Sequence, residues 1–313
     1  MNKKDNTELM LDKMVLVANL YYRSKLSQQD IAQKLNISRP WVSKLLSRAE
    51  ELGIVQIEIN SPTFGNTQLE DQLKAKYGTP YVGVINTYDH SKDYVATAAT
   101  NYFVSQIKPD DVIGIGWGDA VSRFIHQLLP LYLPGTKVVP MAGSFGTSAE
   151  TLPNYVAMQF AGKLGGSSIP LHVPAFCSTK EEYDALIGNE HTQEILSIAN
   201  HADIAITGIG SFTSSFLFRH KILSAEEEET LIRAGAIGDI VLHFINRYGT
   251  PVECDICKRI IHADLFQVRK HARTVIGIAE GPDKIEVIKA ALYNQLVDAF
   301  FTDEATADAL LKK

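Results

Sequence analysis

The stretch SQQDIAQKLNISRPWVSKLLSRAEELG, residues 27–53, predicts two short helices joined by a tight turn. The first helix begins after Ser27, because Ser27 and Asp30 have the spacing of a capping box, with Asp in place of the usual Glu. Ser38 is a good N-cap for the second helix, and Gly53 suits the left-handed residue that ends it. Two such helices match the geometry that enters the major groove of DNA.

The residues on either side of this stretch extend the domain. Apolar residues at helical spacing predict another helix over about 8–22. Polar and apolar residues alternate over 54–60, which predicts a strand, the wing of a winged helix-turn-helix domain. We therefore expect a DNA-binding domain over 1–60. A linker and a connecting helix follow over 61–80, with the helix itself at 67–77.

The charge of the chain is divided unevenly. The whole chain carries 30 Lys and Arg against 36 Asp and Glu, a net charge of −6, which argues against a protein that coats nucleic acid nonspecifically. Residues 1–60 carry nine basic against seven acidic residues, and 25–48 carry five against one. A basic segment attached to an acidic body indicates two separate tasks.

The second helix of the motif offers side chains that bind bases and phosphates. Arg39 can donate two hydrogen bonds to a guanine edge, whereas serine and lysine more often reach phosphate. Trp41 either contacts the DNA backbone or fills the space between helices. The whole segment has an alternative as a generic three-helix interaction module. The candidate DNA contacts on this helix are Ser38, Arg39, Trp41, Ser43, Lys44 and Arg48.

From residue 81 to residue 313 strands and helices alternate, which predicts a Rossmann-like α/β domain with a parallel sheet covered by helices. The predicted strands are 81–86, 112–116, 137–141, 170–173, 203–208, 274–278 and 297–301. The predicted helices are 92–106, 119–129, 151–163, 181–187, 190–199, 226–233 and 283–294.

Four of the predicted strands run into turns rich in glycine or acidic residues. The carboxyl ends of parallel strands meet at one edge of a sheet, where open α/β sheets bind ligands. A helix that starts after such a turn presents free N–H groups to an anion. One glycine after a strand is usually only a turn, but four in one sheet indicate a ligand site. The turns lie within 111–120, 138–148, 205–211 and 277–284.

The composition limits the location and the metal chemistry. No apolar run is long enough to span a membrane, and the first residues lack the apolar core of a signal peptide. Three cysteines suit a reducing compartment, so we expect a cytoplasmic protein. Cys254 and Cys257 have the spacing of half a zinc site, but no second pair completes it. We expect a reduced pair in a surface loop, no metal and no cofactor.

The chain resembles the SorC/DeoR-type bacterial transcriptional regulators with a C-terminal sugar-binding domain, and the resemblance covers essentially its whole length. The block from Gly281 to Ala307 is the most specific part. The matching stretches are LYY at 20–22, SQQDIA at 27–32, SRPWVSKLL at 38–46, GIGWG at 114–118, 202–210, GAIGDI at 235–240, and GPDK at 281–284 through TDEATA at 302–307.

The resemblance implies a fold, a function and a set of site residues. The effector domain of the family is similar to the sugar-phosphate isomerase, deaminase and CoA-transferase folds. Its members bind a sugar or sugar phosphate, which changes their affinity for operator DNA, and they usually assemble as dimers of dimers. Carried over to this chain, the resemblance adds Ser27 and Gln28 to the DNA contacts. It places the effector against Gly116, Gly118, Asp119, Gly143, Ser144, Gly146, Asp239 and Lys284.

The chemistry of these residues leaves two kinds of effector open. N–H groups near 143–146 and the cation of Lys284 can hold a phosphate, and Asp119 and Asp239 can accept hydrogen bonds from sugar hydroxyls. Many relatives carry Thr, Ser or Arg where Asp119 stands, and a carboxylate repels phosphate. The phosphate therefore lies elsewhere, or the effector is an unphosphorylated sugar or polyol. His243 is either a ligand contact or a core histidine.

The fold also allows an enzyme, namely a sugar-phosphate isomerase or deaminase. Its general base would be Glu280, Asp239 or His243. An enzyme has no need of a basic N-terminal helix-turn-helix, so we favour an effector-controlled regulator with no catalytic residues. The sequence does not identify the effector, the operator, the oligomeric state, or whether the protein activates or represses.

Overall fold

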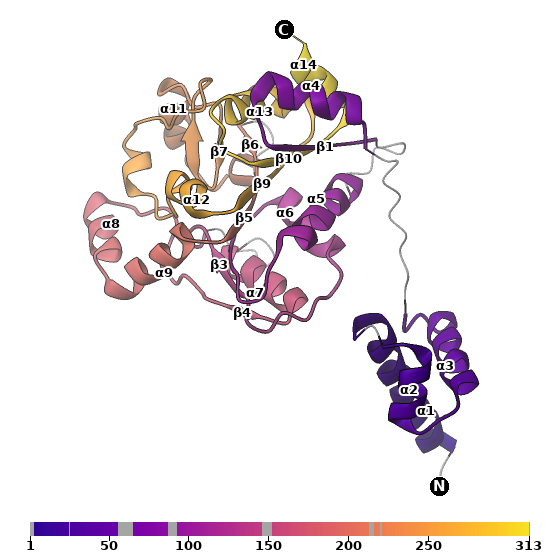
Figure 1. The fold of residues 1–313 in the computed structure, drawn as a ribbon. Helices are drawn as coiled ribbons and strands as arrows, with labels where there is room; N and C mark the ends of the chain where they lie inside the picture. Colours follow the sequence, from indigo (N-terminus) through magenta and orange to yellow (C-terminus); the bar gives the residue numbers. More distant parts are fainter. Residues whose placement is uncertain are drawn as a thin grey trace. The chain divides into compact units, whose positions relative to one another are not determined.

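The computed structural model describes residues 3–24, 26–55, 65–86, 93–145, 152–212, 216–219 and 221–312. It divides into two units, Met1–Pro62 and Thr63–Lys313 (Figure 1).

The N-terminal unit consists of three helices around one small core. Helix α1 spans Lys3–Ala18, so it begins earlier than the expected residue 8, and continues as a π-helical turn, η1, over Asn19–Arg23. Helix α2 spans Gln28–Leu35 and α3 spans Arg39–Glu51. Their shared core contains Met14, Val17, Ala18, Ile31, Ala32, Val42, Leu45, Leu46 and Ala49.

Local hydrogen bonds define both helices of the motif. The Ser27 hydroxyl accepts from the Asp30 N–H and the Asp30 carboxylate accepts from the Ser27 N–H, so the predicted capping box is present. The Ser38 hydroxyl accepts from the Trp41 N–H at 3.3 Å. Gly53 is left-handed, with φ 69°. The predicted wing strand lies largely outside the described residues, and its first two residues, 54–55, are not in a strand.

One side-chain bond joins η1 to α3. The Tyr22 hydroxyl donates to a Glu50 carboxylate oxygen at 2.6 Å. This bond, together with burial and the charge of Glu50, raises the pKa of Tyr22 to about 12. The phenol therefore stays protonated, and able to donate, throughout the physiological range.

The first helix of the larger unit is α4, Thr67–Tyr77, with the bounds expected from the sequence, and the left-handed Gly78 is its C-cap. It is built on a seven-stranded sheet in which every pair of neighbouring strands is parallel, as predicted. In spatial order the strands are β1 (Tyr81–Ile85), β10 (Ala299–Asp303), β9 (Thr274–Ile278), β5 (Ile204–Gly208), β2 (Val112–Ile115), β3 (Lys137–Pro140) and β4 (Ser167–Ser168).

Helices bury both faces of this sheet (Figure 1). One face packs against α5 (Asp93–Gln106), α6 (Asp119–Gln127) and α7 (Pro153–Leu164). The other packs against α4, α9 (Glu190–Asn200), α12 (Leu265–His271), α13 (Ile285–Tyr293) and α14 (Glu304–Leu311). The remaining helices are α8 (Lys180–Ile187), α10 (Phe216–Arg219) and α11 (Ala225–Arg233).

A second sheet follows β5 directly and was not predicted from the sequence. Its antiparallel strands are β6 (Gly210–Ser211), β7 (Gly238–Ile240) and β8 (His243–Ile245). The predicted strand over 170–173 is wrong. There the Asn154 side chain accepts from the Leu171 N–H and donates to the Leu171 carbonyl, so a side chain replaces the hydrogen bonds of a neighbouring strand.

Candidate functional site

Helix α3 presents a basic face opposite its buried stripe. Arg39 and Lys44 are exposed, and the Lys44 ammonium lies 5.6 Å from the centre of the Trp41 ring. Trp41 itself is half-buried and packs on the helical core. Arg48 is exposed and pairs with Glu51 at 2.5 Å. The hydroxyl of Ser38 caps α3, so its position at the start of this face is fixed by the helix itself.

An apolar groove of about 730 Å³ lies between α1 and α3. Met10, Leu11 and Met14 form its α1 wall, and Leu45 of α3 and its C-cap Leu52 lie opposite. Three residues of the basic face, Trp41, Lys44 and Arg48, also line the groove. Met10, Leu11 and Leu52 are each more than a third exposed, and so are Val15 and Leu16 nearby on α1. Helix α1 therefore keeps an apolar face that its own unit does not bury.

In the larger unit, the turn after β2 carries three of the predicted effector residues. A Cβ on Gly116 would lie 3.2 Å from the Ile206 carbonyl, so glycine allows β2 to approach β5 closely. Gly118 has φ 98° and forms the N-cap of α6, with open space where its Cβ would be. Asp119 is exposed in the first turn of α6. The carboxylate thus lies at a helix N-terminus on the carboxyl edge of the sheet.

The loop after β3 is held by its neighbours. The Gly143 N–H donates to the Ile261 carbonyl at 3.0 Å, and a Cβ on Gly143 would lie 2.6 Å from the backbone of Pro174. The Ser144 hydroxyl accepts from the Asn154 side chain at 3.3 Å. Sequence reasoning missed Asn154, since nothing local marks it. Gly146 lies outside the described residues.

The small sheet connects Asp239 to the turn that carries Lys284. Asp239 is 6% exposed, and its carboxylate accepts from the Leu242 N–H at 3.2 Å. Its strand β7 pairs with β6, and the Ser211 hydroxyl of β6 donates to Asp283 at 3.2 Å. Asp283 and Lys284 belong to the 3-10 turn η5, Pro282–Lys284. Both segments therefore lie at the carboxyl edge, beyond β5 and β9.

The β7–β8 turn is strained. Val241 and Leu242, its two central residues, have φ of 53° and 61°, a conformation that favours glycine and asparagine. Both side chains are buried, at 3% and 1% exposure, so core packing supports a turn that these residues would otherwise avoid. The strained turn positions the Asp239 carboxylate beside its own backbone.

An ion pair that sequence reasoning missed fixes α6 to the end of β9. Arg123 Nη2 lies 2.6 Å from a Glu280 carboxylate oxygen, and the Glu280 side chain is only 2% exposed. The two residues are 157 positions apart in the chain. Glu280, the first candidate base of the enzyme alternative, is thus engaged by a guanidinium that holds two elements of the edge together.

His243 is the buried first residue of β8, and its side chain contacts the start of α12. Its Nε2 accepts from the Leu265 N–H at 3.3 Å, and its ring centre lies 4.1 Å from that of His262. Burial, with the neighbouring His262, lowers the pKa of His243 well below its ordinary value, and burial also lowers the pKa of His262. Both imidazoles are therefore neutral at pH 7.

We expect the free energy of unfolding of the larger unit to fall as the pH drops below about 6.5, the ordinary histidine pKa. The folded pKa values of His243 and His262 are depressed, so the unfolded chain binds more protons there, and stability present above that pH is lost on acidification. Urea unfolding at pH 7.5 and 5.5 measures the loss. H243Q should reduce the loss, whereas substitution of the exposed His191 by Gln should not. If the native chain and H243Q lost the same free energy of unfolding between the two pH values, the loss would not come from His243.

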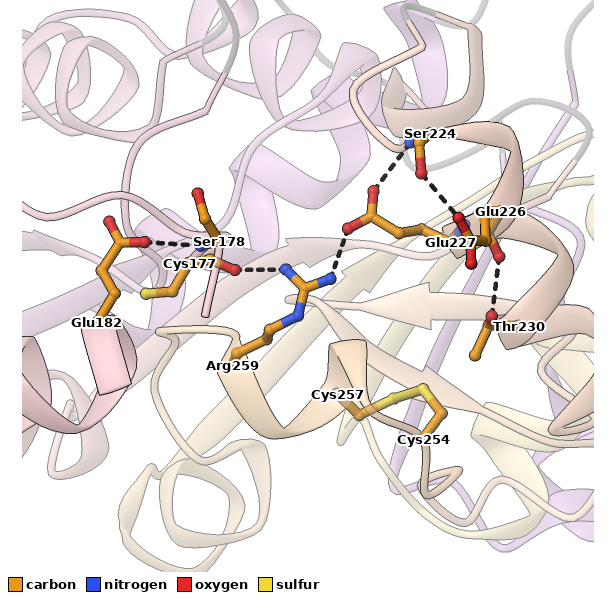
Figure 2. Close-up of polar contacts among 10 residues, drawn as sticks. All are labelled: Cys177, Ser178, Glu182, Ser224, Glu226, Glu227, Thr230, Cys254, Cys257 and Arg259. Atoms are coloured by element: carbon orange, nitrogen blue, oxygen red, sulfur yellow. Dashed lines mark hydrogen bonds and ion pairs between the residues drawn. A yellow bond between two sulfur atoms is a disulfide. The ribbon is translucent and has the colours of Figure 1, made fainter. Parts of the chain in front are cut away.

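A cavity of about 630 Å³ lies beside the small sheet, between α11, residues 176–178 and the 3-10 turn η4, Ile256–Arg259 (Figure 2). None of the predicted effector residues within the described part of the chain lines it. Arg259 crosses it, with one nitrogen donating to the Cys177 carbonyl and another 2.7 Å from Glu227. Burial raises the pKa of Glu227, but hydrogen bonds from Ser224 and Arg259 outweigh it and hold the pKa below its ordinary value.

Cys254 and Cys257 form a disulfide beside this cavity (Figure 2). The expectation of a reduced pair is therefore wrong. The η4 turn brings the two residues within 5.2 Å of each other, measured between Cα atoms. Among the residues that the structure describes, no three metal-ligating side chains cluster, and no helix is long and apolar enough to cross a membrane.

Comparison with known proteins finds chains similar to this one in sequence and in structure. Residues 61–312 match the family model described as "Putative sugar-binding domain". The chain is 29% identical to the deoxyribonucleoside regulator of Bacillus subtilis, over 94% of this chain and 95% of that protein. It is also 29% identical to the sorbitol operon regulator of Klebsiella pneumoniae, over 96% and 97%. The crystal structure of the full-length sorbitol operon regulator SorC superposes with a TM-score of 0.76, covering 96% of this chain and 99% of that one at 28% identity.

Proposed function

We propose that this chain, which belongs to the SorC/DeoR-type family of transcriptional regulators with a sugar-binding domain, reads its operator through α3 and holds its effector at the carboxyl edge of the large sheet. The protein is a sugar-sensing transcriptional regulator. One observation carries the proposal: a single chain joins a capped helix-turn-helix with an exposed basic second helix to a domain that the sugar-binding model matches over its whole length.

The proposed DNA contacts are those of α3 with the start of α2, and Arg39 tests them. R39A should weaken operator binding by about 1–3 kcal/mol, roughly 5- to 150-fold, and relax base choice at one position if Arg39 pairs with guanine. Fluorescence anisotropy with operator and single-base variants measures both effects. The matched control is K13A, which removes an exposed cation from α1. Unchanged affinity and base preference in R39A would refute the contact.

The proposed effector is a sugar, a polyol or a sugar phosphate. Asp119 and Asp239 would accept from hydroxyl groups, and Gly116, Gly118, Gly143, Ser144, Gly146, His243 and Lys284 remain proposed contacts, although the buried His243 imidazole already accepts from a backbone N–H. The names of the two relatives refer to a deoxyribonucleoside and to the polyol sorbitol. A thermal-shift screen over sugars, polyols and their phosphates identifies the class, because a ligand at a hundredfold excess over its Kd stabilises the native state by about 2.7 kcal/mol.

We expect at least a dimer that recognises an operator with inverted repeats. Paired helix-turn-helix units read two half-sites, and the exposed apolar residues of α1, Met10, Leu11, Val15 and Leu16, offer a surface that a second copy can cover. Light scattering at micromolar concentration should give at least twice the chain mass. L11D should shift the protein toward smaller species, whereas D12N, at an exposed residue of the same helix, should leave its mass unchanged. A monomer that still binds operator tightly would contradict this expectation.

The regulator is proposed to act in the cytoplasm and without catalysis. The alternative enzyme would turn over sugar phosphates through Glu280, Asp239 or His243. Glu280 is ion-paired with Arg123, and Asp239 and His243 each accept a hydrogen bond from a backbone N–H. These bonds occupy acceptor atoms that a general base would use, so they do not favour catalysis. Incubation with sugar phosphates and analysis of the products separates the two functions, since a regulator releases its ligand unchanged.

A further inference from the structure

We propose that Cys254 and Cys257 form a reversible redox site, whose thiol–disulfide state controls the order of the segment 259–263, called here the strap. The disulfide joins residues three positions apart (Figure 2). Both cysteines are half-buried, so a thiol in solution can reach them, while the third cysteine, Cys177, is fully buried and unpaired with any other cysteine.

Two physical arguments favour a redox role over a purely structural one. A disulfide that closes so short a loop removes little conformational entropy from the unfolded chain, so it stabilises the fold less than a disulfide that closes a long loop. Disulfides in reducing compartments are usually transient or redox-sensing. The second argument rests on the proposed cytoplasmic location, and the first is independent of it.

The cysteine pair lies at the start of a series of contacts that ends at the loop after β3, called here the effector loop because Gly143 and Ser144 are proposed effector contacts. Asp255 and Ile256, which the disulfide encloses, line the cavity, and Arg259 follows two residues after Cys257. The guanidinium of Arg259 bonds the Cys177 carbonyl and pairs with Glu227 of α11 (Figure 2). The disulfide therefore fixes the turn from which a single side chain bridges two other segments.

The strap continues from Arg259 as an extended segment whose backbone bonds two other segments in turn. The Cys177 N–H donates to the Arg259 carbonyl at 2.9 Å, and the Ile261 N–H donates to the Ala175 carbonyl at 2.7 Å. The Gly143 N–H then donates to the Ile261 carbonyl at 3.0 Å. Gly143 belongs to the loop after β3, a proposed effector contact. Loosening the turn at 254–257 thus releases one end of the segment that supports this loop.

The exchange needs a dithiol as its reductant. A thiolate of the dithiol attacks one sulfur of the Cys254–Cys257 bond, breaks it and forms a mixed disulfide. The second thiol of the reductant then attacks that mixed disulfide. Two electrons and two protons pass to the cysteines, which end as two thiols, and the reductant ends as a cyclic disulfide. A small disulfide such as oxidised glutathione reverses the reaction.

The oxidation state of the native chain is measured by alkylation and intact mass. One sample is equilibrated with oxidised glutathione, and a second is then reduced with dithiothreitol under native conditions. Both are denatured and treated with N-ethylmaleimide. We expect one label on the oxidised chain and three on the reduced chain. C177A should give none and two. Three labels in both samples would show that the pair does not form a disulfide. One label in both would show that dithiothreitol does not reduce the disulfide in the native chain. Either result overturns the proposal.

Hydrogen exchange tests the coupling to the effector loop. Peptides covering 141–145 and 259–263 should exchange faster in the reduced native chain than in the oxidised one, while peptides from α5 should not change. The double variant C254S/C257S should match the reduced chain whatever reagent is added. Equal exchange in both states would overturn the coupling. None of these measurements uses DNA or a sugar, so their failure would leave the proposed regulator function standing.

Discussion

Replacing Arg123 by alanine should lower the free energy of unfolding of the larger unit by about 3–5 kcal/mol. The substitution removes a guanidinium 2.6 Å from a Glu280 carboxylate that is 2% exposed, and it leaves that charge in a poorly solvated position. The effect should lie toward the lower end of this range, because the Arg123 side chain is itself 23% exposed and water can enter its place. Urea denaturation of the full chain measures the change.

The controls separate the buried pair from an ordinary surface contact. R233A removes an exposed partner of Glu229, at 74% and 61% exposure, and should cost less than about 1 kcal/mol. The double variant R123M/E280Q removes both charges and should recover part of the loss, since no unpartnered ion is then created. If R123A cost no more than R233A, the pair would not fix α6 to the carboxyl edge of the sheet.

Replacing Lys284 by alanine should distinguish the two classes of effector. If the effector carries a phosphate, the loss of a charge-assisted hydrogen bond should weaken binding by about 1.5–3 kcal/mol, roughly 10- to 150-fold. If the effector is a neutral sugar or polyol, K284A should cost less and D119A should cost more, because a carboxylate accepts hydroxyl hydrogen bonds but repels phosphate. Isothermal titration with the effector found in the screen measures both variants.

Operator binding without effector should survive both changes, since neither residue belongs to the N-terminal unit. K137A is the matched control for lost charge, because Lys137 is the exposed first residue of β3, at the amino end of the strand. A structure with effector bound beyond hydrogen-bond reach of Asp119, Asp239 and Lys284 would show that the resemblance misplaced the site.

Much of the fold was predictable because its signals are local. The capping serines, the left-handed Gly53 and the apolar periodicities of the helices all act within one or two turns of chain, and the structure confirms them. The alternation of strands and helices likewise predicted the parallel sheet. The small sheet was not predicted because its strands have two or three residues, too few for an alternating pattern to appear.

The sequence by itself determined a basic helix-turn-helix followed by a parallel α/β domain, and it marked the turns at the carboxyl ends of the strands. Only the tertiary structure decided which side chains meet there. Arg123 and Glu280 lie 157 positions apart. The Asn154 side chain bonds the backbone of Leu171, where a strand was expected over 170–173. Such partners are brought together by the packing of whole elements, which leaves no periodicity near either residue, so no local pattern could have predicted them.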